Sequence, residues 1–138
     1  MTAALPDQLR DRLRSLDRVL SKLEGLLQRE NPEEAVVLGS IHLFEIAVEL
    51  FWKSMKDALM IDGVPLASPK PVLRKAGESG WVDDVTLTLE MINLRNETTH
   101  RYDQGLLDAV REIRSLYAPA MRRGQERLLA KLEDDPDA

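Results

Sequence analysis

The sequence contains no cysteine among its 138 residues, and only 4% of them are aromatic. The absence of cysteine excludes disulfides, thiolate metal ligands and cysteine nucleophiles. The scarcity of aromatic side chains argues against a stacking platform for single-stranded nucleic acid. The net charge of −5, from 19 basic and 24 acidic residues, argues against bulk electrostatic binding of RNA. Any contact with RNA would therefore depend on a local basic patch.

Long apolar runs are also missing. No stretch approaches the roughly 18 consecutive apolar residues that a membrane span needs. The N-terminal stretch MTAALPDQLRDRLRSL lacks the apolar core of a signal peptide. We therefore expect a cytoplasmic protein without membrane association. The length fits one domain over 1–138, and the acidic tail, 133–138, is expected to be flexible.

Apolar residues recur at helical spacing along most of the chain. One stripe, at alternating steps of four and three, consists of Leu9, Leu13, Leu16, Leu20, Leu23 and Leu27. A second helix, expected over 32–61, is apolar on more than one side, which indicates a central helix or one that also meets a partner. Further helices are expected over 69–78, 82–102 and 106–132, the last kinked at Pro119. With no segment of period two, the sequence predicts an all-α antiparallel bundle of four to five helices.

The expected helix over 82–102 carries two apolar faces. One face is formed by Val82, Val85, Leu89 and Ile92, and the nearly opposite face by Leu87, Met91, Leu94 and Thr98. Both sides are therefore expected to be covered. One would face the bundle core, and the other would most simply meet a two-fold copy of the same chain.

The end of this helix gathers Arg95, Asn96, His100 and Tyr102. An imidazole can act as general base on a ribose 2′-OH, and a guanidinium can hold a phosphate and stabilise its growing charge. Asn96 could donate to a phosphate oxygen or orient His100. Residues five apart leave a straight helix roughly 140° apart and about 7.5 Å along its axis. A catalytic pair of Arg95 and His100 therefore favours a helix that ends near His100, or a dimer. The structural alternative is a helix end with a salt-bridged Arg95 and a hydrogen-bonded His100.

Two carboxylates, Glu45 and Glu49, stand four residues apart in the second expected helix. Without a histidine at ligand spacing we expect no metal, and an ion pair with Arg95 or Lys53 instead. A later basic run contains Arg111, Arg114, Arg122, Arg123 and Arg127. This run either supplies positive potential for RNA phosphates or is a solvated helix face.

The segment RNETTHRY, 95–102, resembles the Arg-x4-His-x-Tyr motif of the nucleotidyltransferase substrate-binding family, which lies within the HEPN superfamily of small helical bundles. Three further stretches match in order and spacing: FEIAVELFWKSMKD (44–57), SPKPVLRKAGESGWVDD (68–84) and LEMINLRN (89–96). Together the four segments extend the resemblance over most of 7–132.

The resemblance implies a dimeric bundle encoded beside a minimal nucleotidyltransferase, as the toxin of a toxin–antitoxin pair. Such a toxin is a metal-independent endoribonuclease without a cofactor, often directed at tRNA. The nucleotidyltransferase silences it by adenylylating the motif tyrosine, which is Tyr102 here. The resemblance makes Arg95 and His100 the catalytic candidates. We add Asn96 to the catalytic candidates from its position in the sequence. The expected supporting residues are Glu45, Glu49, Thr99 and Asp103. The resemblance also permits a non-catalytic subunit that binds substrate for a nucleotidyltransferase.

Overall fold

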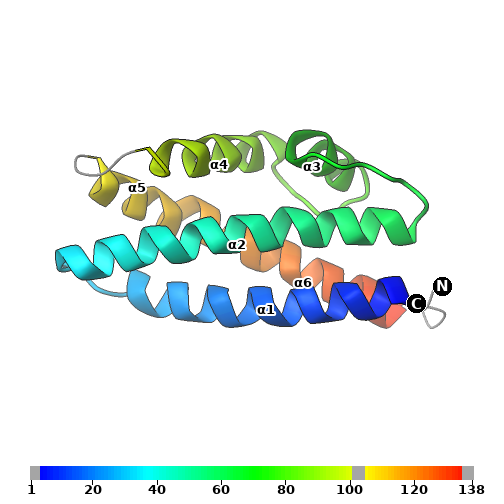
Figure 1. The fold of residues 1–138 in the computed structure, drawn as a ribbon, viewed down its shortest axis with the longest axis horizontal. Coiled ribbons are helices and arrows are strands. Elements are labelled where there is room, and N and C mark those ends of the chain that lie inside the picture. The colour runs from blue at the N-terminus through cyan, green and yellow to red at the C-terminus, as the bar shows by residue number, and fades with distance from the viewer. Residues whose placement is uncertain (1–3, 101–104, 135–138) are drawn as a thin grey trace.

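The structure is a computed structural model that describes residues 4–100 and 105–134, and these residues form an all-α bundle (Figure 1). The helices are α1 (Ala4–Leu27), α2 (Glu34–Ile61), α3 (Pro69–Glu78), α4 (Val85–Thr98), α5 (Leu106–Glu112) and α6 (Ala118–Asp134), with a π-helical segment, Ile113–Tyr117, between the last two. The predicted fold class is confirmed.

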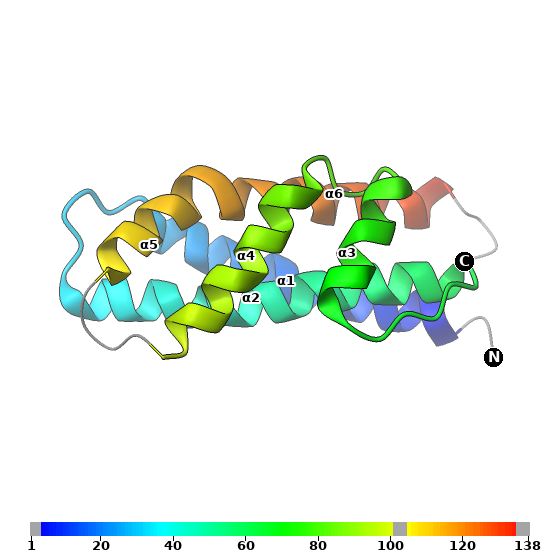
Figure 2. The ribbon, with the colours of Figure 1, turned by 90° about the horizontal axis from the view of Figure 1, so that it is seen from above.

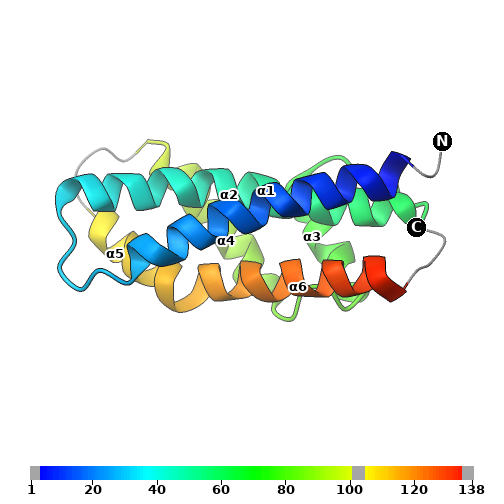
Figure 3. The same cartoon turned by 90° about the horizontal axis from the view of Figure 1, so that it is seen from below.

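The leucine stripe of α1 forms one wall of the core. All six leucines are buried, with at most 4% of any of them exposed. They face α2 and α6, which lie beside α1 along its length (Figure 3). The charged residues between them remain at the surface, as an amphipathic helix requires.

Helix α2 is the centre of the molecule. It contacts α1, α3, α4, α5 and α6, and its Phe44, Phe51 and Met55 are essentially inaccessible to solvent. Among the described helices, α2 is long and apolar enough to cross a membrane by length and composition alone. Its contacts explain that composition, since a helix covered on several sides is apolar on several sides. The helix begins at Glu34, two residues later than predicted.

Helix α4 is shorter at both ends than the predicted 82–102. Its N-cap is Asp84, whose carboxylate accepts a hydrogen bond of 3.0 Å from the Leu87 N–H. The preceding Asp83 is held by Arg123 and Arg127 of α6. These contacts keep 82–84 outside the helix, and α4 ends at Thr98. In Figure 2, α4 and α3 lie across α2.

The two apolar faces of α4 do not require a second chain. Met91 on one face is fully buried, and Ile92 on the other is 5% exposed. Val85, Leu87 and Leu89 are partly buried against the same core. The single chain therefore covers much of both faces, and a dimer must be argued from other features.

The predicted helix over 106–132 is interrupted just before Pro119, as expected. The interruption is a π-helical segment, Ile113–Tyr117, rather than a simple kink. The Ala118 N–H donates to the Ile113 carbonyl, five residues back, immediately before Pro119, which has no N–H to donate. Gly105, with φ of +85°, precedes α5. Helix α6 continues to Asp134, so the first two residues of the predicted flexible tail are helical.

Candidate functional site

Arg95 lies on the last turn of α4 and is tied to α2 by an ion pair. Its Nη2 is 2.5 Å from Glu49 Oε1, and both side chains are 32% exposed. The second oxygen of Glu49 is 3.4 Å from Lys53 Nζ. Glu49 therefore has both of the partners that its position in the sequence suggested. One carboxylate links two cations at the crossing of α2 and α4.

A second contact ties the same turn of α4 to α2. The hydroxyl of Thr98, a residue only 5% exposed, lies 2.8 Å from Glu45 Oε2 and 3.0 Å from the Arg95 carbonyl oxygen. The sequence pattern placed Thr98 only on an apolar face. Glu45 and Glu49 are one helical turn apart, as are Thr98 and Arg95, so two contacts in parallel hold the end of α4 against α2.

Asn96 forms a side-chain hydrogen bond with Arg95. Its Oδ1 accepts a hydrogen bond of 3.2 Å from Arg95 Nη1, and Thr99 donates from its hydroxyl to the Asn96 carbonyl at 2.8 Å. Within the described residues, no hydrogen bond joins the side chains of Asn96 and His100. In this structure the side-chain oxygen of Asn96 is engaged by Arg95, and the suggested roles of Asn96 toward His100 or a phosphate oxygen remain predictions.

His100 lies just beyond the end of α4. Its backbone N–H donates to the Glu97 carbonyl in a turn, and the residue is exposed. Because the helix ends at Thr98, the 140° separation expected from straight-helix geometry does not apply to His100. Tyr102 and Asp103 lie outside the described residues.

One buried donor of Arg95 has no partner among the described residues. Its Nε is buried and has no hydrogen-bond partner among the described residues, as is also true of Trp52 Nε1. An unsatisfied buried donor is costly. The ion pair with Glu49 therefore holds the guanidinium in a position that leaves its Nε–H unpaired within the described part of the chain.

The basic run that follows is largely neutralised within the chain. Arg122 lies 2.7 Å from both Asp17 and Glu24, and its hydrogen bond to Glu24 raises its pKa above the ordinary value. The other ion pairs are Arg111 with Asp108, and both Arg123 and Arg127 with Asp83. Within the described part of the chain, four of the five arginines thus have an acidic partner, which favours the structural interpretation of this run over a free basic patch.

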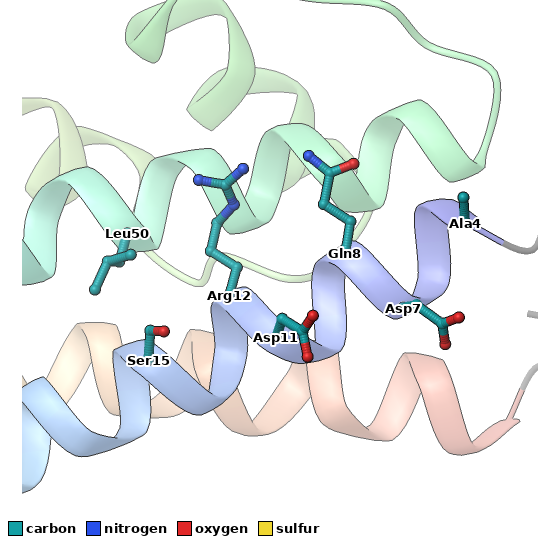
Figure 4. A pocket seen from close by; sticks show the side chains of 7 residues that line it. All are labelled: Ala4, Asp7, Gln8, Asp11, Arg12, Ser15 and Leu50. Carbon is teal, nitrogen blue, oxygen red and sulfur yellow. The ribbon is translucent and has the colours of Figure 1, made fainter.

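Among the hollows on the described surface, five have a lining that includes none of Arg95, Asn96 and His100. The largest, of about 560 Å³, lies along α1 and α2 (Figure 4). Its lining includes Asp7 and Asp11, and its one arginine, Arg12, bonds Asp57 at 2.7 Å. Such a lining is poorly suited to a polyanion. Asn96 and His100 are exposed, and Arg95 is partly buried.

The described residues contain no group of three or more His, Asp or Glu side chains arranged to hold a metal ion. The chemistry available at the end of α4 is instead that of a fixed guanidinium, an amide and an exposed imidazole. This set can bind an anion and move a proton.

The all-α bundle and the polar groups at the end of α4 together define a class of small helical proteins. Comparison with known protein families identifies that class. Residues 11–130 match the family described as nucleotidyltransferase substrate binding protein like. The chain belongs to this family, within the HEPN-like helical bundles, as the motif at 95–102 predicted.

Two relatives support the assignment. The chain is 32% identical over 77 residues to a protein of Haemophilus influenzae (strain ATCC 51907 / DSM 11121 / KW20 / Rd) named "Probable ribonuclease HepT". That alignment covers 52% of this chain and 53% of the relative, so the chain spans about half the length of the curated relative it matches. A crystal structure of a Thermus thermophilus protein superposes with a TM-score of 0.70 at 31% identity, covering 85% of this chain and 98% of that one.

Proposed function

We propose that this protein is a HEPN-type endoribonuclease toxin whose reaction needs no metal ion. The observation that carries the proposal is the end of α4, where Arg95 is fixed by Glu49 five residues before the exposed His100. Membership of the family and the likeness to a protein named as a ribonuclease support an RNA substrate. The proposed substrate class is RNA with an accessible 2′-OH, and tRNA is the first candidate within it.

The proposed reaction is an internal transesterification. His100 takes the proton of a ribose 2′-OH, whose oxygen attacks the adjacent phosphorus, and the bond from phosphorus to the 5′ oxygen breaks. The departing oxygen takes a proton from solvent or from a protonated imidazole. Arg95 neutralises the charge that grows on the phosphate oxygens, and Asn96 holds one terminal nitrogen of Arg95. The products are a 2′,3′-cyclic phosphate and a 5′-hydroxyl.

A second copy of the chain is proposed to complete the site. His100 is exposed, and neither His100 nor Arg95 lines any of the five hollows described above. A two-fold dimer that joins these surfaces would bring two Arg/His sets together and exclude water from the reacting phosphate.

The proposed partner in regulation is a minimal nucleotidyltransferase that adenylylates Tyr102. An AMP group on this tyrosine, two residues from His100 in the sequence, would add bulk and negative charge beside the site. Both changes oppose entry of RNA.

The test is cleavage of RNA by the purified chain in the presence of a chelator. Wild type is expected to cleave, and His100→Ala is expected to lose about 100-fold or more, the usual contribution of a general base. His42→Ala is the matched control, since His42 is the other of two histidines and is exposed on α2. Equal cleavage by wild type and His100→Ala would remove His100 from the mechanism.

A non-catalytic adaptor for a nucleotidyltransferase is the second candidate. It is favoured by the family's description and by the neutralisation of Arg95 within the chain. An adaptor would bind the nucleotidyltransferase stably, cleave no RNA and keep its function in Arg95→Ala. Stable binding together with absence of cleavage would support the adaptor and contradict the ribonuclease.

A further inference from the structure

Glu49 is the one acidic group, among the described residues, that touches the guanidinium proposed to hold the RNA phosphate. Glu49 Oε1 lies 2.5 Å from Arg95 Nη2, and Glu49 Oε2 lies 3.4 Å from Lys53 Nζ. The half-buried setting of this pair reduces screening by water, so the interaction is stronger than an ordinary surface ion pair. Glu49 is thus placed to affect both the orientation of Arg95 and the charge that an incoming anion meets.

The hydrogen bonds of Arg95 leave a defined part of the group for a ligand. A guanidinium has five N–H donors. Nη2 faces Glu49, Nη1 donates to Asn96 Oδ1 at 3.2 Å, and Nε is buried. Counted against the described residues alone, one N–H bond on each terminal nitrogen has no partner. A phosphate that approaches these terminal nitrogens would share Arg95 with Glu49.

We propose that Glu49 is a positioning residue that holds the terminal N–H groups of Arg95 toward the scissile phosphate. Its own negative charge at the same time weakens ground-state binding of RNA. This inference rests on the ribonuclease function proposed above. Fixed orientation raises turnover, because a small displacement of a catalytic group is costly. A carboxylate near the phosphate lowers affinity through repulsion. The two effects have opposite signs, which a purely structural role would not produce.

The experiment compares wild type with Glu49→Gln, Glu49→Asp and Glu90→Gln in the presence of chelator. Glu90→Gln is the matched control, because it removes an exposed carboxylate from α4, five residues before Arg95. Cleavage at saturating RNA gives kcat. Fluorescence anisotropy with a 2′-O-methylated oligonucleotide, which lacks the attacking hydroxyl, gives affinity without turnover. Thermal unfolding followed by circular dichroism verifies that each variant is folded.

In Glu49→Gln we expect kcat to fall at least about tenfold while the Kd for the methylated RNA falls about threefold. In Glu49→Asp the charge is kept and the reach is shortened, so kcat falls with Kd close to that of wild type. The Asp variant alone decides the positioning claim if the Gln variant does not fold. Glu90→Gln is expected to keep the kcat of wild type.

Three results would overturn the inference. They are an unchanged kcat in both Glu49 variants, a Kd that rises in Glu49→Gln, and a fall in kcat of the same size in Glu90→Gln. Failure of the proposed function would look different, since the wild-type chain would then cleave no RNA. The role given to Glu49 would fall together with that function.

Discussion

At the scale of single residues, the two tyrosines of the chain have opposite prospects as acceptors of AMP. Tyr117 is 5% exposed, its ring lies 6.1 Å from that of Phe44, and burial raises the pKa of its hydroxyl above the ordinary value of 10.0. A buried, protonated phenol is a poor nucleophile. Modification should therefore fall on Tyr102, in the motif.

We expect mass spectrometry, after incubation with the cognate nucleotidyltransferase and ATP, to find one AMP group on Tyr102. Tyr102→Phe should abolish the adduct, whereas Tyr117→Phe should keep it. An adduct on Tyr117, or an unmodified chain in a mixture where the nucleotidyltransferase is active, would contradict the proposed regulation.

Some residue contacts followed from the sequence and others did not. The ion pairs of Glu49 with Arg95 and Lys53 were predicted from a carboxylate in an apolar setting. The bond between Thr98 and Glu45 was not, because spacing within one helix does not say which residues of another helix it meets. The position of His100 depended on where α4 ends, and that end carries no strong stop signal in the sequence.

At the scale of elements, ion pairs fix the segment that precedes α4. Asp83 pairs with Arg123 and Arg127 of α6 just before the Asp84 cap. The hydrogen bond from Arg127 is the largest cause that lowers the pKa of Asp83 below the ordinary 3.8. A carboxyl whose pKa is lowered by folding stabilises the fold above its unfolded pKa and loses that contribution as the pH falls through its folded pKa.

Asp83→Asn should therefore lower the melting temperature at pH 7, by a small amount because the pair is exposed. The difference from wild type should shrink as the pH falls below 3.8. Calorimetry at a series of pH values measures the melting temperatures of wild type and Asp83→Asn, and hence their difference. A constant difference across that range would mean that packing or helix capping, not charge, is what the substitution changes.

Regular helices were predictable from pattern, and their irregular joints were not. The leucine stripe of α1 specifies its buried face residue by residue. The start of α4 moved from Val82 to Val85 because arginines 40 or more residues away hold Asp83 outside the helix. The π-helical segment before Pro119 likewise depends on the loss of one backbone donor, which the sequence locates without saying how the chain adjusts.

At the scale of the whole molecule, much of the positive charge is used internally. The chain has net charge −5, and four arginines of its basic run pair with carboxylates. RNA binding by a single chain should accordingly be weak. A dimer that joins two motif surfaces concentrates four of the proposed catalytic side chains, two arginines and two histidines, in one cleft.

We expect sedimentation velocity to give twice the mass of the chain at micromolar concentration. Arg95→Ala and His100→Ala should regain part of the lost cleavage when mixed and allowed to exchange, because a mixed dimer keeps one arginine and one histidine in the shared cleft. A monomer that cleaves RNA at the wild-type rate would rule out a composite site.

The central claim is that the end of α4 directs attack of a ribose 2′-OH without a metal ion. It is tested most directly by the chemical identity of the RNA ends formed in the presence of chelator. The account predicts a 2′,3′-cyclic phosphate and a 5′-hydroxyl from wild type, and neither product from His100→Ala. A 3′-hydroxyl with a 5′-phosphate, or the same cyclic ends from both proteins, would contradict it.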